Sequence, residues 1–100
     1  MELTSKDGNM VVDYYPVKDF DNNLINNRML KVLSFRGDTQ KKMLISKDEF
    51  YYQVREYIMK YKYSVTNEDY PVQYISKYDY ANDPTLWASK LSLTEVNSND

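Results

Sequence analysis

Cysteine and histidine are both absent from this chain of 100 residues. Without cysteine, the protein has no disulfide bond, no thiol nucleophile and no thiolate ligand for a metal. Without histidine, it lacks the commonest general base near neutral pH and the commonest nitrogen ligand of zinc. Carboxylates, lysines and tyrosines are the groups left for acid–base chemistry, which argues against most familiar kinds of active site.

Glycine is almost absent as well, because Gly8 and Gly37 are the only two. A phosphate-binding loop needs several closely spaced glycines, and neither GxxxxGK[ST] nor GxGxxG occurs. No apolar run reaches the roughly 18 residues of a membrane-spanning helix, so we expect no contact with membranes. The first ten residues lack the basic and apolar regions of a secretory signal, which favours a cytoplasmic location.

The acidic pairs of the sequence have structural explanations. The segment "DFDNN" begins at Asp19 with the spacing of a calcium loop, but it lacks the loop glycine and the later glutamate. Asp48 and Glu49 would stabilise the positive end of the helix that they begin. "RGD" at 36–38 is typical of an ordinary hairpin turn. We therefore predict that the protein is not an enzyme and binds no metal and no cofactor.

Hydrophobic residues make up 42% and charged residues 28% of the chain, which predicts a single folded domain over 1–100. The charge is unevenly distributed along it. Residues 28–62 hold nine Lys and Arg against four Asp and Glu, whereas residues 1–27 and 63–100 are both acidic. Either the acidic flanks neutralise the basic middle in the fold, or they form a bipolar surface that orients a charged partner. Clustered acidic residues could also mimic nucleic acid.

Two segments predict a β-hairpin, residues 29–35 and 40–45, joined by a turn centred on Gly37 and Asp38. In that register Val32 lies opposite Met43 and Leu30 lies opposite Ile45, and these four form the core side. Leu33, Phe35 and Leu44 then lie on the other face. Residues 9–15 predict an earlier strand and residues 70–78 a last one, whereas the asparagine-rich segment 18–28 predicts a loop.

A helix is predicted over 47–62. Ser46 is a good N-cap residue, and Glu49 three positions later completes the pattern of a capping box. Spacing of 3.6 residues per turn then places a set of large residues on one side, which we assign to the core. This stripe consists of Phe50, Val54, Tyr57, Ile58 and Tyr61.

A second, short helix is predicted over 84–91, with Asp83 as its N-cap and Pro84 in its first turn. The polar segments 1–8 and 92–100 are predicted to be flexible. The fold class is therefore α+β: a small, mostly antiparallel sheet of about four strands with the main helix 47–62 packed on it.

Tyrosine is unusually common, with eleven in the chain. Tyr52, Arg55, Met59 and Lys62 line up opposite the core stripe of the predicted helix, and Tyr, Arg and Met are enriched at protein interfaces. We predict that these four residues bind a partner. Two other interpretations remain: a solvated face with scattered apolar residues, or a face covered by another element such as 84–91.

The favoured hypothesis is a non-catalytic module that binds a protein. In its small size and its richness in Asn, Lys and Tyr, the chain resembles small phage or mobile-element proteins that bind and inhibit a host factor. One alternative is a nucleic-acid-binding accessory protein that uses the basic segment 28–62, with lysines contacting phosphates and tyrosines stacking on bases. Another is a structural or assembly subunit, and self-association into a homo-oligomer fits any of these hypotheses.

Overall fold

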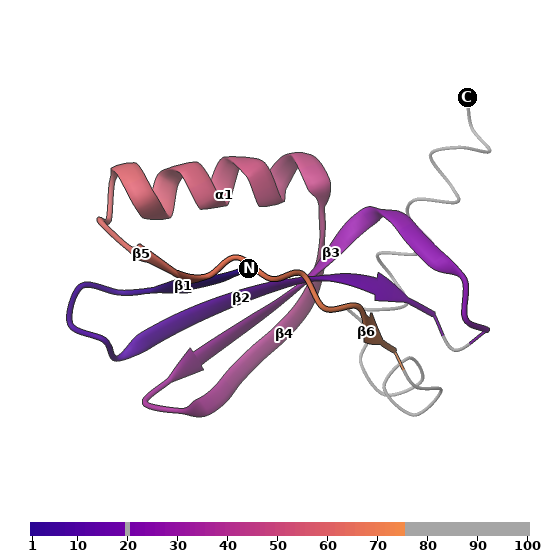
Figure 1. Cartoon of the computed structure of the whole chain (residues 1–100), viewed down its shortest axis with the longest axis horizontal. Coiled ribbons are helices and arrows are strands. Elements are labelled where there is room, and N and C mark those ends of the chain that lie inside the picture. The colour runs from indigo at the N-terminus through magenta and orange to yellow at the C-terminus, as the bar shows by residue number, and fades with distance from the viewer. Residues whose placement is uncertain (20, 76–100) are drawn as a thin grey trace.

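The computed structural model of the chain describes residues 1–19 and 21–75, in which one helix lies across one face of a twisted sheet (Figure 1). In chain order the elements are β1 (Glu2–Thr4), β2 (Met10–Lys18), β3 (Leu24–Phe35), β4 (Asp38–Ser46), α1 (Lys47–Met59), β5 (Ser64–Asn67) and β6 (Gln73–Tyr74).

The strands form one open sheet in the order β4-β3-β2-β1-β5, and β6 pairs with the end of β2. Neighbouring strands are antiparallel except for β2 and β6, which are parallel. The predicted α+β class is confirmed, but the sheet has six strands rather than about four. The predicted helix 84–91 and the tail 92–100 lie outside the described residues.

The N-terminal segment was assigned to a flexible region, but residues 2–4 form a strand inside the sheet. β1 lies between β2 and β5, where Leu3 pairs with both Val12 and Val65. Leu3 is completely buried, although its neighbours in the sequence are polar. A three-residue strand is too short for an alternating pattern to be recognised, so only the pairing with distant strands shows its role.

The loop predicted over 18–28 is also wrong, because β3 already begins at Leu24. The reversal before it is tight. The Asp19 carboxylate accepts the backbone N–H groups of Asp21 and Asn23, both at 3.0 Å, and these bonds close the turn. Local side-chain bonds of the kind expected from this polar segment are therefore present, but they occupy fewer residues than predicted.

The β3–β4 hairpin turns one residue earlier than predicted. Its two turn residues are Arg36 and Gly37, with φ of 51° and 85°, and Phe35 pairs with Asp38. Positive φ at both central positions is the conformation of a type I′ turn, which matches the twist of the strands. The register also shifts between Leu33 and Ser34, which leaves an additional residue in β4.

As a result, the predicted pairs of this hairpin are wrong. Leu30 lies opposite Leu44, and Val32 lies opposite Lys42. A one-residue change in register moves every side chain of one strand to the other face. Leu33 and Leu44, which the predicted register places on one face, consequently lie on opposite faces: Leu33 packs on the helix side and Leu44 in the other cluster.

Both faces of the sheet carry a hydrophobic cluster. The cluster on the helix side is formed by Leu3, Val12, Tyr14, Met29 and Phe50. The cluster on the opposite face is formed by Val17, Ile25, Leu30, Leu44 and Ile75. β2 and β3 contribute to both clusters, since alternate residues of a strand point to opposite faces.

The start of α1 follows the local sequence signals. Ser46 is the N-cap, and its hydroxyl accepts the N–H of Glu49 at 3.0 Å. Phe50 is buried, and Val54 and Ile58 pack partly buried beside it. The predicted core stripe is therefore confirmed from Phe50 to Ile58, whereas Tyr61, beyond the end of the helix, is 49% exposed.

The helix ends at Met59 rather than at residue 62. The Tyr61 N–H donates to the Glu56 carbonyl oxygen, five residues back, at 3.2 Å. Lys62 takes a left-handed conformation with φ of 61°, and the Tyr63 N–H then reaches the Tyr57 carbonyl oxygen at 2.8 Å. No glycine or proline marks this end, so the local sequence predicted a longer helix.

Candidate functional site

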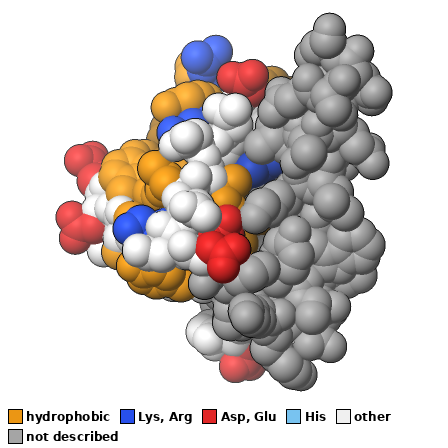
Figure 2. Space-filling view, turned by 90° about the vertical axis from the view of Figure 1, so that its right-hand side faces the viewer, with side chains coloured by type: hydrophobic (Ala, Val, Ile, Leu, Met, Phe, Trp, Pro, Cys, Tyr) orange, Lys and Arg blue, Asp and Glu red, His pale blue; other side chains and the backbone are white. Residues whose placement is uncertain are grey.

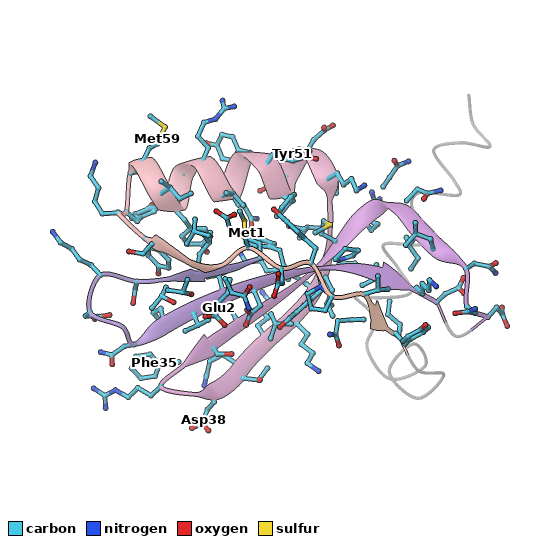
Figure 3. All side chains as sticks on the ribbon, in the orientation of Figure 1. Met1, Glu2, Phe35, Asp38, Tyr51 and Met59 are labelled. Atoms are coloured by element: carbon cyan, nitrogen blue, oxygen red, sulfur yellow. The ribbon has the colours of Figure 1, made fainter. Side chains whose placement is uncertain are left out.

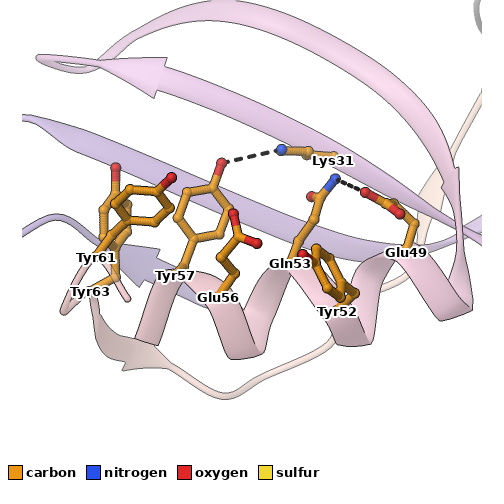
Figure 4. A pocket seen from close by; sticks show the side chains of 8 residues that line it. All are labelled: Lys31, Glu49, Tyr52, Gln53, Glu56, Tyr57, Tyr61 and Tyr63. Carbon is orange, nitrogen blue, oxygen red and sulfur yellow. Dashed lines mark hydrogen bonds between the residues drawn. The ribbon is translucent and has the colours of Figure 1, made fainter. Parts of the chain in front are cut away.

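A groove of about 410 Å³ runs along one flank of α1, between the helix and β3 (Figure 4). Most of its lining comes from a single side of the helix, Lys31 comes from β3, and two tyrosines come from the segment that follows the helix. The lining residues are Lys31, Glu49, Tyr52, Gln53, Glu56, Tyr57, Tyr61 and Tyr63.

A chain of hydrogen bonds connects the floor of the groove to the core. The fully buried Tyr14 donates its hydroxyl to the Gln53 side-chain oxygen at 2.7 Å. The Gln53 amide nitrogen in turn donates to the Glu49 carboxylate at 3.1 Å. Burial raises the pKa of Tyr14 far above its usual range, so this hydroxyl stays protonated and remains a donor.

Lys31 places a half-buried positive charge in the groove. Its ammonium group donates to the Tyr57 hydroxyl at 3.3 Å and lies 5.3 Å from the centre of the same ring. Burial lowers the pKa of Lys31, while the negative charge of Glu49 acts in the opposite direction. The Lys31 ammonium therefore lies against Tyr57 of the helix, and the negative charge of Glu49 partly neutralises it.

Tyrosine rings build the end of the groove near the helix C-terminus. The ring centres of Tyr57 and Tyr63 are 4.7 Å apart, and those of Tyr57 and Tyr61 are 6.2 Å apart. The left-handed residue Lys62 reverses the chain, which brings Tyr63 back to Tyr57. This contribution of Tyr63 was missed, because helical periodicity says nothing about residues beyond the helix end.

Glu56 lies between Tyr57 and Tyr52 on the helix wall (Figure 4). Interaction of its carboxylate with the Tyr52 hydroxyl raises the pKa of Tyr52. Within residues 1–19 and 21–75, neither Glu49 nor Glu56 forms an ion pair with a lysine or arginine. The groove therefore presents two carboxylates and several aromatic faces around one withdrawn ammonium group.

The four residues predicted to bind a partner are all exposed, and Tyr52, Arg55 and Met59 keep their predicted alignment on the helix. Tyr52 belongs to the wall of the groove. Met59 is the last helical residue and points away from the sheet (Figure 3). Lys62 lies beyond the helix in a left-handed conformation, so its predicted position on the helix face is wrong. Arg55 is on the helix outside the groove lining.

Comparison with models of known families, with curated proteins and with solved structures produced no match. In the described part of the chain, no helix is long and apolar enough to cross a membrane. The chemistry of the groove is suited to recognition: carboxylates accept hydrogen bonds, tyrosine hydroxyls donate or accept them, and ring faces contact apolar or cationic groups.

Proposed function

We propose that this chain is a non-catalytic protein-binding module whose contact surface includes the exposed side of α1. The main support is the exposure of large side chains on a well-anchored helix. Tyr52 is 61% exposed and Met59 is 66% exposed, and Arg55 is exposed between them. Residues of these three types are enriched at protein interfaces, and Tyr and Arg are among those that supply most of the binding energy.

A stable protein interface buries about 800 Å² on each partner, which is more than one face of a 13-residue helix offers. Further exposed aromatic residues extend the surface. On the flank of α1 away from the groove, Tyr51 and Tyr70 border a smaller hollow of about 200 Å³. Figure 2 shows one end of the molecule, where hydrophobic side chains of the described residues are exposed at the surface between charged groups.

A nucleic-acid-binding role receives less support, because the basic residues of 28–62 do not share one surface. Lys41 and Lys42 are consecutive in β4 and therefore point to opposite faces of the sheet. Lys47 begins α1 and Lys60 follows its other end. Lys31 is half-buried and hydrogen-bonded to a tyrosine. A phosphate backbone needs positive charges along one continuous path.

The finer hypothesis, that a phage or mobile element uses the protein to inhibit a host factor, rests on the small size and composition of the chain. It requires that the partner lose activity when it is bound. An assembly subunit would instead bind a structural protein or further copies of itself, and either partner would use the same exposed residues of α1.

The experiment is to recover the partner from the native host by crosslinking and then to measure its affinity for purified variants. Replacing Arg55 and Met59 together by alanine should weaken binding at least about thirtyfold, which corresponds to one interface hot spot. The melting temperature should remain near that of the wild type, because both side chains are exposed.

A double replacement of the exposed residues Gln40 and Lys42 on β4 by alanine provides the control and should leave the affinity unchanged. Unchanged binding by the Arg55 and Met59 variant would overturn the proposed surface. Recovery of nucleic acid instead of protein, with retention that falls steeply as salt increases, would favour the alternative function.

A further inference from the structure

The composition of the groove beside α1 indicates which group of a partner it receives. Its lining contains two carboxylates, those of Glu49 and Glu56, and a single ammonium, that of Lys31. The ammonium is half-buried and bonded to Tyr57, whereas both carboxylates belong to exposed or partly exposed residues of the helix wall. A charged group that enters from solvent therefore meets negative charge first.

Glu56 is the carboxylate best placed for an incoming cation. Tyr52, one helical turn earlier, and the adjacent Tyr57 line the groove on either side of it along the helix (Figure 4). Glu49, by contrast, already accepts a hydrogen bond from Gln53. A carboxylate near aromatic rings suits a cation that can contact a ring face and donate hydrogen bonds to the carboxylate at the same time.

We propose that this groove binds an arginine side chain of the partner protein, with its guanidinium group against Glu56 and between Tyr52 and Tyr57. This inference rests on the proposed protein-binding function and specifies the partner chemistry. A guanidinium group is planar, stacks on aromatic rings and donates two parallel hydrogen bonds to one carboxylate. The compact and strongly hydrated ammonium group of lysine fits such a site less well.

Lys31 opposes this binding but does not prevent it. Its positive charge repels a second cation, and its neighbour Glu49 offsets part of that repulsion. The lining itself holds two carboxylates to one ammonium, which favours a cation, and the Lys60 ammonium, 5.4 Å from the Tyr61 ring centre, adds a repelling charge only at the helix end.

The test titrates the full chain, labelled with ¹⁵N, with short blocked peptides. Changes in the amide chemical shifts of the protein in NMR spectra report binding. The probe is acetyl-Ala-Ala-Arg-Ala-Ala-amide. The same peptide with citrulline in place of arginine keeps the shape and loses the charge, and a third peptide carries glutamate. The arginine peptide should shift the amides around Glu56 and Tyr57 and bind at least about tenfold more tightly than the citrulline peptide.

Three variants then locate the contact. Glu56→Gln should weaken binding of the arginine peptide by about tenfold, because it removes the charge-assisted bonds. Asp48→Asn removes a carboxylate from the same helix outside the groove lining and should change the affinity by less than about twofold. Lys31→Met removes the repelling ammonium and should strengthen binding.

Equal binding of the arginine and citrulline peptides, preferred binding of the glutamate peptide, or an unchanged affinity in Glu56→Gln would each overturn the proposal. Its failure can be told apart from failure of the proposed function. If no peptide binds but the Arg55 and Met59 variant loses the partner, the function stands without the arginine site. If the peptide binds and that variant keeps the partner, the contact surface on α1 is the part that fails.

Discussion

On the core side of α1, Phe50 packs against the ring of Tyr14 with 4.9 Å between ring centres, and it exposes 5% of its surface. On the groove side, Tyr52 lies two residues further along the same helix and exposes 61%. Aromatic side chains on the two flanks thus experience very different surroundings. On the core side they exclude water, and on the groove side they stand next to carboxylates and solvent.

The partners of the tyrosine hydroxyls show the same contrast. Tyr14 is completely buried, and its hydroxyl donates to Gln53, so the polar atom is satisfied inside the protein. The Tyr52 hydroxyl interacts with Glu56 on an exposed part of the helix, where water can take the place of either group. Loss of a hydroxyl should therefore cost stability on the core side and affect only recognition on the groove side.

The largest expected effect comes from the core side. Phe50→Ala should lower the free energy of unfolding by about 3–5 kcal/mol, because it leaves a cavity against Tyr14 and Met29. Tyr51→Ala is the matched control, since the adjacent ring is exposed, and it should cost less than about 1 kcal/mol. Urea denaturation followed by circular dichroism measures both. Similar losses in the two variants would contradict the assignment of the core side.

Tyr14→Phe should destabilise the protein by about 1 kcal/mol, because the partly buried side-chain oxygen of Gln53 loses its donor. Tyr61→Phe changes an exposed hydroxyl and should be close to neutral. If both variants retain wild-type stability, the bond between Tyr14 and Gln53 contributes nothing.

The pH dependence of stability gives a second reading of the same residue. Burial raises the pKa of Tyr14 in the folded state, so the folded protein keeps a proton that the unfolded chain loses above about pH 10. Stability should therefore fall as the pH rises above that value. The fall should be smaller in Tyr14→Phe than in the wild type. Urea titrations at pH 9 and pH 11 measure the free energy of unfolding of both proteins, and an equal decrease between the two pH values would contradict the explanation.

A smaller effect is expected where α1 ends and the groove begins. Lys62→Gly should stabilise the protein by up to about 1 kcal/mol, because its left-handed backbone, with φ of 61°, is easier for glycine. Lys60→Gly should have the opposite effect, since Lys60 has the right-handed conformation of a helix. Thermal unfolding of the two variants compares them directly, and the same sign in both would argue against this helix end.

The smallest effect on stability is expected on the groove side. Tyr52→Ala should change the free energy of unfolding by less than about 0.5 kcal/mol, because the ring is exposed. The same variant should bind the arginine peptide more weakly than the wild type does in the NMR titration. A clear loss of stability would show that Tyr52 packs as a core residue and would remove the distinction between the two flanks.

Several features of the fold could be predicted because they depend on neighbouring residues. The start of α1 follows from Ser46 and its bond to the Glu49 N–H. The burial of Phe50 follows from helical periodicity. The α+β class follows from one strongly patterned helix among β-branched and aromatic segments.

Other features depend on partners that lie far away in the sequence. β1 could not be recognised, because its place is set by pairing with β2 and β5. The hairpin register was wrong by one residue because both Arg36-Gly37 and Gly37-Asp38 are plausible turn pairs, and packing on both faces selects between them. Lys62 was assigned to the helix because no glycine indicates its end.

By itself, the amino-acid sequence determined that cysteine and histidine chemistry is absent from this chain and where α1 begins. The tertiary structure decided that Tyr52 belongs to a groove and that this groove also contains Lys31 and Tyr63. Lys31 is 26 residues from Tyr57, its hydrogen-bond partner. Spacing along a helix reports only on contacts within that helix, whereas a site assembled from a strand, a helix and the chain beyond it depends on strand register and on how the helix packs.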